Sequence, residues 1–311
     1  MQTAAVLFQT PRSVSVATLD LQAAGADDVV VAVEWSGISA GTERLLWTGD
    51  MPLFPGLGYP LVPGYEAVGR IAAAGDAHAD RIGETVFVPG AQCFRDARGL
   101  FGASAARLVV PAGRAKPVDA ALGPDAILFA LAATAHHALA GGPLPELIVG
   151  HGVLGRLAAR LVVALGGAAP TVWERESSRR GGARGYTVLD PADDDRRDYR
   201  AILDLSGDAS VVDALVGRLA RGGEIVLGGF YKDRVSFAFP PAFMREARMR
   251  VAAEWTEPDL AAVRDLVAAG GLSLAGLVSH AAPTRDAAAA YATAFEDPGC
   301  LKMILDWKGL P

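Results

Sequence analysis

A glycine-rich turn between an apolar strand and a helix constrains this chain more than any other feature. Residues 147–155 read Leu-Ile-Val-Gly-His-Gly-Val-Leu-Gly, a G-x-G-x-x-G pattern that leads into an alanine-rich segment. Gly150 would make a tight turn, Gly152 would let the backbone approach a pyrophosphate, and Gly155 would let the helix pack closely on its strand. The free N–H groups at the start of that helix would face the phosphates. The pattern therefore predicts a strand–turn–helix unit that binds a dinucleotide.

An acidic residue follows this turn at the distance expected for a ribose ligand. The apolar run Pro170–Trp173 ends in Glu174, which lies 19 residues after Gly155. A carboxylate there can accept hydrogen bonds from the ribose hydroxyls and would repel a 2′-phosphate, which favours NAD over NADP. Two later strand ends also carry small residues, although both could be ordinary tight turns. The candidate cofactor-binding residues are Gly150, Gly152, Val153, Leu154, Gly155, Glu174, Ser206, Gly228 and Gly229.

Composition restricts the class of protein. A chain of 311 residues with 51% hydrophobic residues, 36 Gly and 19 Pro suits a compact, turn-rich α/β protein of two domains. A net charge of −6 gives no indication of a nucleic-acid partner. Two cysteines argue against a disulfide framework and fit a reducing cytosol. With neither a signal peptide nor a transmembrane segment in the pattern, we expect a soluble cytoplasmic protein. The oligomeric state stays open, and a homodimer is compatible with the sequence.

The pattern of secondary structure changes twice along the chain. Residues 1–118 are β-branched, often alternating and separated by Gly, Pro and Asp, as in a small antiparallel barrel. Residues 119–271 alternate between helix and strand, which predicts a doubly wound parallel sheet. Residues 272–311 return to short strands around one helix and would fold back on the barrel. The expected early strands are Thr3–Gln9, Val14–Thr18, Val29–Ser36, Glu66–Ala73, Glu84–Pro89 and Ala106–Val110. The expected helices are Ala126–Ala140, Gly155–Leu165, Ser210–Leu219, Pro258–Ala269 and Thr284–Phe295.

Three segments resemble the medium-chain dehydrogenase/reductase superfamily in the right order. Residues 35–43, Trp-Ser-Gly-Ile-Ser-Ala-Gly-Thr-Glu, resemble its G-I-C-G-T-D turn. Residues 61–69, Leu-Val-Pro-Gly-Tyr-Glu-Ala-Val-Gly, resemble its P-x-x-x-G-H-E-x-x-G segment, and residues 134–139 resemble its T-A-x-x-A-L helix. The resemblance implies an α/β protein with a GroES-like β-barrel catalytic domain and a Rossmann NAD-binding domain.

The departures from that superfamily concern zinc. Its zinc-dependent members bind the metal through the cysteine of the first turn and the histidine of G-H-E. Here Ser39 and Ala40 stand in the turn, and Tyr65 replaces the histidine. A structural zinc would need four cysteines in one lobe, where only Cys93 is present. Hydroxyl and phenol groups are poor zinc ligands beside thiolate and imidazole, so we expect an enzyme that works without a metal.

A narrower resemblance points to one family within the superfamily. The segment beginning at Ser36, S-G-I-S-A-G-T-E-R-L-L-W-T-G-D-M, and the segment beginning at Val149, V-G-H-G-V-L-G-R, resemble the bacteriochlorophyllide a dehydrogenases. That resemblance implies NAD-dependent oxidation of the 3-(1-hydroxyethyl) group of a chlorin, a magnesium tetrapyrrole, to an acetyl group in bacteriochlorophyll biosynthesis.

The candidate catalytic residues are Thr42, Tyr65 and Ser39. Without a metal, a side chain must accept or relay the proton of the alcohol. Thr42 stands where many members of the superfamily place a proton-relay hydroxyl, and Tyr65 could offer its phenol to the substrate oxygen. Each also has a structural interpretation, as a turn hydroxyl or a buried tyrosine. Glu43 and Glu66 are expected to brace loops rather than to act as bases.

The candidate substrate-binding residues are Trp47, Phe54, Tyr59 and His137. The first three lie in a loop rich in glycine, proline and aromatic residues, which suits a flat apolar ligand. Anchoring of that long loop on the barrel explains the same residues equally well. His136 and His137 are adjacent, so we expect them to point to different faces of their helix, and a core or surface role explains either one.

Two other functions remain compatible with the sequence. One is a zinc-free quinone or enoyl reductase of the same superfamily, which would prefer NADPH; Glu174 argues against it. The other is a non-catalytic protein that binds NAD or a pigment, which the intact glycine turn makes less favourable.

Overall fold

The computed structural model describes residues 1–52 and 55–309, which divide into two compact units. The first unit comprises residues 1–130 and 274–311, and the second comprises residues 131–273. The sequence analysis places the boundary near residue 119 instead. Residues 119–130 lie with the first unit because they form a 3-10 helix, Ala120–Leu128, and then pack Phe129 against Phe87, with ring centroids 6.1 Å apart.

The first unit is built mainly from antiparallel strands around an apolar core. Over the described residues, β1 pairs with β2 in one small sheet, and a seven-stranded sheet has the order β14-β15-β3-β4-β5-β7, with β6 on β3. The tail of the chain joins this sheet because β15 runs antiparallel to β3 and pairs Leu305 with Ser36. The strands are β1 Gln2–Phe8, β2 Val14–Asp20, β3 Asp28–Ile38, β4 Ala67–Ala74, β5 Thr85–Val88, β6 Arg107–Pro111, β7 Lys116–Pro117, β14 His280–Pro283 and β15 Met303–Asp306.

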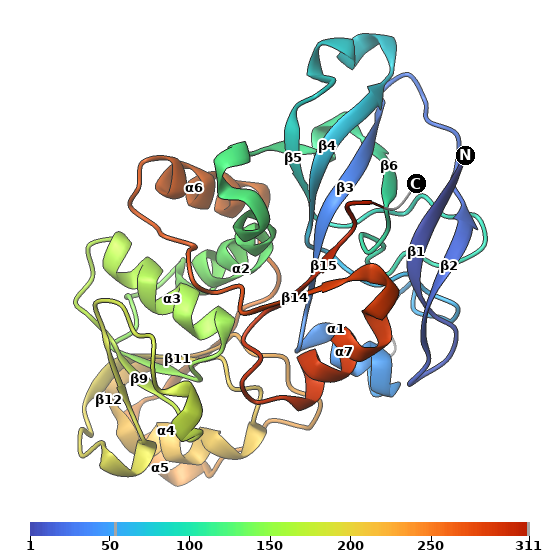
Figure 1. Ribbon diagram of the computed structural model, residues 1–311. Helices are drawn as coiled ribbons and strands as arrows, with labels where there is room; N and C mark the ends of the chain where they lie inside the picture. The colour runs from blue at the N-terminus through green and yellow to red at the C-terminus, as the bar shows by residue number, and fades with distance from the viewer. Residues whose placement is uncertain (53–54, 310–311) are drawn as a thin grey trace. The chain divides into compact units, whose positions relative to one another are not determined.

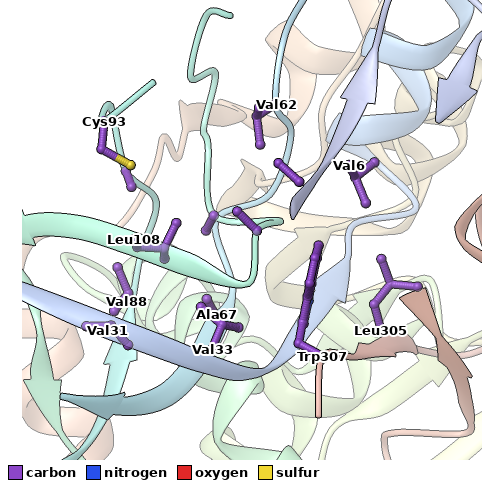
Figure 2. Close-up of a cluster of buried hydrophobic side chains, with 14 of the residues drawn as sticks. Val6, Val31, Val33, Val62, Ala67, Val88, Cys93, Leu108, Leu305 and Trp307 are labelled. Carbon is purple, nitrogen blue, oxygen red and sulfur yellow. The ribbon is translucent and has the colours of Figure 1, made fainter. Parts of the chain in front are cut away.

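Alternation of apolar residues along these strands produces the core of the first unit. Figure 2 shows Val31, Val88, Leu108 and Trp307, which come from different parts of the chain, in one cluster of buried side chains. All four are at most 2% exposed, and burial of such a side chain stabilises the fold by about 1.5–3 kcal/mol. The indole of Trp307 also donates a hydrogen bond to Ser36 Oγ at 2.8 Å. The C-terminal segment is therefore an integral part of this unit.

Helices lie beside the sheet where the candidate site begins. α1 Thr42–Thr48 and α7 Ala287–Glu296 lie close together (Figure 1). They are in contact through the rings of Trp47 and Phe295, whose centroids are 5.5 Å apart. The sequence analysis interprets residues 42–48 as a turn and a loop, whereas the structure shows α1 there. Short 3-10 helices cover Asp76–Arg81, Ala112–Arg114 and Thr284–Asp286.

The second unit is a doubly wound parallel sheet, which confirms the predicted fold class. In the described part of the chain the sheet has six parallel strands in the order β10-β9-β8-β11-β12-β13. The strands are β8 Leu147–Val149, β9 Thr171–Trp173, β10 Thr187–Leu189, β11 Tyr199–Asp204, β12 Leu219–Leu227 and β13 Arg248–Val251. The helices are α2 Phe129–Leu139, α3 Val153–Ala164, α4 Val212–Arg218, α5 Phe239–Arg245 and α6 Glu257–Ala268, with 3-10 helices at Ser177–Arg179, Pro191–Asp193 and Ala209–Val211.

Helix boundaries differ from those predicted where glycine and proline intervene. The helix expected from Ala126 begins as an α-helix at Phe129, because Gly123 has a left-handed conformation (φ +53°) and Pro124 follows it within the 3-10 segment.

No helix of the described residues is long and apolar enough to cross a bilayer.

Candidate functional site

The glycine turn of the second unit is shaped to receive a phosphate. β8 ends at Val149, and α3 begins at Val153 with Gly152 as its N-cap and with no side chain capping it. Gly150 has φ +99°, which favours glycine, and a Cβ at Gly155 would lie 1.9 Å from the Gly150 carbonyl oxygen. A Cβ at Gly152, by contrast, would have no atom of the described residues within 4 Å. The open space at Gly152 and the uncapped helix N-terminus together fit a pyrophosphate.

Glu174 lies at the end of β9 with its carboxylate against this turn. Its Oε2 accepts the His151 N–H at 3.1 Å, and its Oε1 accepts the Glu176 N–H at 2.9 Å. Each carboxylate oxygen can accept a further hydrogen bond, so the group remains able to bind ribose hydroxyls. The arrangement fits the adenosine side of a dinucleotide.

The ring of His151 has a structural role in holding the turn. Its Nε2 lies 2.9 Å from the Tyr186 hydroxyl, and its Nδ1 lies 2.7 Å from the Arg179 carbonyl oxygen. Arg156 Nε donates to the His151 carbonyl at 3.0 Å. Burial lowers the pKa of His151, which keeps this ring neutral beside the arginine.

The other predicted cofactor residues lie at the ends of β11 and β12. Ser206 N–H donates to the buried Asp204 carboxylate at 2.9 Å. A Cβ at Gly228 would lie 2.9 Å from Leu205 Cδ2, and a Cβ at Gly229 would lie 2.7 Å from a backbone nitrogen of the adjoining turn. Close packing between the two strand ends therefore explains both glycines, and their contact with a cofactor stays a prediction.

Ser39, Thr42 and Tyr65 come together in the first unit. The Tyr65 hydroxyl donates to Ser39 Oγ at 2.6 Å, and Tyr65 also hydrogen bonds with Thr42. Ser39 follows β3, Thr42 opens α1, and Tyr65 precedes β4. Burial, reinforced by the carboxylate of Glu66, raises the pKa of Tyr65 well above its usual value. The phenol therefore stays protonated at neutral pH and can donate a hydrogen bond.

Glu43 hydrogen bonds to the backbone of this hydroxyl cluster and is completely buried. Its Oε1 accepts the Ser39 N–H at 3.1 Å, and its Oε2 accepts the Tyr291 hydroxyl at 2.8 Å. Burial raises the pKa of Glu43 to about 7, against the opposing effect of these hydrogen bonds. Its geometry agrees with the expectation that it braces the Ser39 turn.

A buried ion pair that the sequence analysis misses supports the same turn. Lys302 Nζ contacts Glu66 Oε2 and donates to the Ile38 carbonyl at 3.0 Å, and both side chains are at most 2% exposed. Lys302 directly precedes β15 and lies more than 200 residues after Glu66 in the chain. Its position within the apolar run Cys300–Leu305 is the signal that could have marked it as a buried, paired charge.

The predicted substrate residues of the first unit make structural contacts. The guanidinium of Arg12 lies over the Trp47 ring, 5.4 Å from its centroid, and Phe295 packs on the same side chain. The Tyr59 hydroxyl donates to the Leu46 carbonyl. Phe54 lies outside the described residues. These contacts are those expected of a loop anchor, and a contact with substrate stays a prediction for Trp47 and Tyr59.

His136 and His137, which are adjacent in their helix, both reach the same carboxylate. His136 Nδ1 lies 2.8 Å from Asp259 Oδ1, and His137 Nδ1 lies 2.9 Å from Asp259 Oδ2. One carboxylate from α6 is therefore placed between both rings. Asp259 lies more than 120 residues after the histidines, so no local sequence pattern connects it with them.

The zinc ligands of the superfamily have no counterpart in the geometry of the described residues. Among them, no group of three His, Cys, Asp or Glu side chains is placed to bind a metal ion. Ser39 and Tyr65 instead hydrogen bond to each other. That donor set does not fit a zinc ion, and independence from metal remains a prediction.

Comparison with known proteins places this fold and site in a class and then in a family. The alcohol dehydrogenase GroES-like domain family matches residues 25–120. The structure of an Escherichia coli CFT073 alcohol dehydrogenase complexed with NADH superimposes with a TM-score of 0.84 at 20% identity, over 98% of this chain and 99% of that one. The protein thus has the medium-chain dehydrogenase/reductase fold.

Two relatives are similar from end to end. The 2-desacetyl-2-hydroxyethyl bacteriochlorophyllide A dehydrogenase of Cereibacter sphaeroides is 57% identical over 99% of both chains, and the protein of that name from Rhodobacter capsulatus is 56% identical over 99% of both. The chain belongs to the family of 2-desacetyl-2-hydroxyethyl bacteriochlorophyllide A dehydrogenases.

Proposed function

We propose that this protein oxidises the 3-(1-hydroxyethyl) group of a bacteriochlorophyllide or chlorophyllide to an acetyl group, with NAD as hydride acceptor, in bacteriochlorophyll a biosynthesis. The observation that carries the proposal is the 57% identity over 99% of the chain with a relative whose name states this substrate. The hydroxyl cluster of Ser39, Thr42 and Tyr65 supports it, because oxidation of an alcohol needs a group that takes up or relays the hydroxyl proton.

The second unit supplies the residues that would hold the cofactor. Bound NAD would accept the hydride from the carbon of the alcohol. The open space at Gly152 and the first N–H groups of α3, at Val153 and Leu154, would bind the pyrophosphate. Glu174, already oriented by two backbone N–H groups, would accept hydrogen bonds from the ribose and repel a 2′-phosphate. We expect NAD to bind at least about tenfold more tightly than NADP, a difference of about 1.4 kcal/mol.

The raised pKa of Tyr65 defines what its phenol can do. A phenol that stays protonated cannot serve as a resident base, so it would relay the proton. Tyr65 would donate its own proton to Ser39 Oγ while its oxygen takes the proton of the alcohol, and Ser39 would release its own hydroxyl proton to solvent water. Thr42 would orient the same phenol. Glu43 holds the Ser39 turn from below through the backbone N–H. In this scheme Ser39, Thr42 and Tyr65 replace the proton transfer that zinc assists in metal-dependent relatives.

A substrate and cofactor matrix tests the proposal against its two alternatives. Purified protein would be assayed with NAD and a hydroxyethyl chlorin, and separately with NADPH and quinone or enoyl substrates. The proposal predicts turnover in the first assay alone. Turnover only in the second would identify a quinone or enoyl reductase, and binding of NAD and pigment without turnover in either would identify a non-catalytic protein.

The same proposal includes a cytoplasmic homodimer. Neither cysteine forms a disulfide and both are buried, as suits a reducing compartment. β13 is an edge strand of the described sheet, and Phe239, Phe243 and Met244 of α5 and Val251 of β13 are each at least 65% exposed. An unpaired strand edge next to apolar side chains is typical of an interface between copies. Sedimentation analysis should give twice the chain mass, and a monomer at all concentrations would contradict the dimer.

A further inference from the structure

Asp259 fixes the orientation of two neighbouring imidazoles. Its Oδ1 lies 2.8 Å from His136 Nδ1, and its Oδ2 lies 2.9 Å from His137 Nδ1. Oδ2 also accepts the N–H and the hydroxyl of Thr256, at 2.9 and 2.6 Å, which makes Asp259 part of the N-terminal capping box of α6. The carboxylate is 5% exposed and has a donor on each oxygen, so it cannot easily rotate.

This arrangement determines which nitrogen of each ring is available. With Nδ1–H donated to a carboxylate, a neutral imidazole carries its lone pair on Nε2. Within the described residues, neither Nε2 has a hydrogen-bond partner. His137 is the more accessible of the two, because its side chain is 30% exposed against 20% for His136. A histidine whose Nδ1–H is bound by a carboxylate is the usual form of a metal-ligating histidine.

The histidine pair lies beside the edge of the sheet where ligands bind. Ala138, the next residue after His137, would contact a Cβ at Gly228 at 3.5 Å, and Gly228 directly follows β12. Arg250 from β13 donates to the Ala138 carbonyl at 2.9 Å. The last turn of α2 is therefore held at the carboxyl ends of β12 and β13, the side of a doubly wound sheet that receives ligands.

We propose that His137, positioned by Asp259, coordinates the central magnesium of the chlorin substrate through Nε2. This rests on the proposed function, which makes a magnesium tetrapyrrole the substrate. The macrocycle supplies four equatorial nitrogens to the metal and leaves an axial position, for which a neutral imidazole with a fixed lone pair is a suitable ligand. The ligand would select metallated pigment and orient the flat ring, a role that apolar contacts alone cannot perform.

A binding assay with paired pigments tests the proposal. The probes are the hydroxyethyl magnesium chlorin and the same chlorin without metal. The wild-type protein should bind the magnesium form at least about tenfold more tightly, with a shift of the pigment absorption band that reports axial ligation. His137→Leu should lose about tenfold affinity for the magnesium form, leave the metal-free affinity within about twofold, and abolish the band shift. Imidazole added to His137→Ala should restore the shift.

Control variants separate ligation from a structural tie between α2 and α6. His136→Leu removes the neighbouring contact to Asp259 and should keep the magnesium preference, as should His78→Leu in the first unit. Equal losses for both pigments in His137→Leu, or a preference lost in His136→Leu instead, would overturn the proposal. The wild-type protein alone also tests the magnesium-ligand proposal, even if no variant folds. Equal affinity for both pigments, without a shift of the absorption band, would overturn it. If the wild type oxidises neither pigment, the proposed function fails; if it oxidises and binds both equally, only the magnesium ligand fails.

Discussion

At the scale of single residues, the hydroxyl groups of Ser39, Thr42 and Tyr65 come together in one hydrogen-bonded cluster. The short contact between Tyr65 and Ser39, and the hydrogen bond of Tyr65 with Thr42, turn these separate segments into one polar cluster. The raised pKa of Tyr65 keeps its phenol protonated, which suits the hydrogen-bond donation and proton relay that we propose for it. The chemistry of the cluster therefore depends on the position of each hydroxyl.

Removing one hydroxyl at a time tests that dependence. Thr42→Val and Tyr65→Phe keep the size of the side chain, and we expect each to lower kcat more than it raises KM. A positioned proton-transfer group contributes about 10²–10⁴-fold in rate. Steady-state kinetics with the hydroxyethyl chlorin, after NAD binding has been shown to be intact, gives the comparison. Rates within a few fold of wild type for both variants would remove these hydroxyls from the mechanism.

Glu43 predicts a pH-dependent stability. Its pKa is raised from 4.5 to about 7 in the folded protein, so the folded state holds a proton that the unfolded chain releases between these values. The stability that Glu43 contributes is therefore complete below pH 4.5 and is lost as pH rises to about 7, by about 3 kcal/mol over the 2.5 units. Glu43→Gln should abolish this decline.

Chemical denaturation of wild type and Glu43→Gln at pH 5 and pH 8 measures the effect. The free energy of unfolding of the wild type should fall relative to that of the variant at the higher pH. A constant difference between the two proteins across this range would show that Glu43 is ionised throughout.

At the scale of elements, the glycine turn combines two distinct requirements that two substitutions can separate. Gly152 is extended (φ −69°, ψ −176°) and faces open space, so Gly152→Val should preserve folding and lower NAD affinity by about tenfold or more. Gly155→Ala should instead destabilise the unit by about 1–3 kcal/mol, because its Cβ would lie 1.9 Å from the Gly150 carbonyl oxygen. Calorimetric titration and thermal unfolding of both variants check this, and equal effects on both measurements would contradict it.

Local sequence predicts such elements well where the requirement is itself local. The G-x-G-x-x-G turn and the strand that ends at Glu174 each follow from neighbouring residues, and their geometry fits the predicted role. Helix α1 was missed because Gly41 precedes it and a glycine-rich loop follows it, so the short pattern resembles a turn. The start of α2 was misplaced because the 3-10 segment before it is equally apolar.

Partners that come from distant parts of the chain could not be predicted in this way. Lys302 reaches Glu66, Tyr291 reaches Glu43, and Asp259 reaches both histidines only after the chain has folded. Each was foreseeable at most as a polar residue within an apolar or helical segment. These long-range contacts orient the side chains of the candidate site. Sequence motifs identify those side chains but do not show how they are oriented.

At the scale of the whole molecule, a dehydrogenase fold combines with a hydroxyl cluster that we propose to work without a metal. The first unit has a hydrogen-bonded pair of a hydroxyl and a phenol, and the described residues contain no cluster of three metal-ligating side chains. Purified protein should therefore contain less than stoichiometric zinc and keep its activity after chelation. Elemental analysis that finds one zinc per chain, lost together with activity, would contradict this account.

The central claim is that this chain couples oxidation of the hydroxyethyl group to reduction of NAD. The most direct test is an anaerobic incubation of the purified protein with NAD and a 3-(1-hydroxyethyl) chlorin, in which the pigment spectrum and NADH absorption are recorded together. The account predicts one NADH for each acetyl chlorin formed, with no reaction when either the protein or NAD is omitted. Unchanged pigment, or conversion of the pigment without stoichiometric NADH, would contradict it.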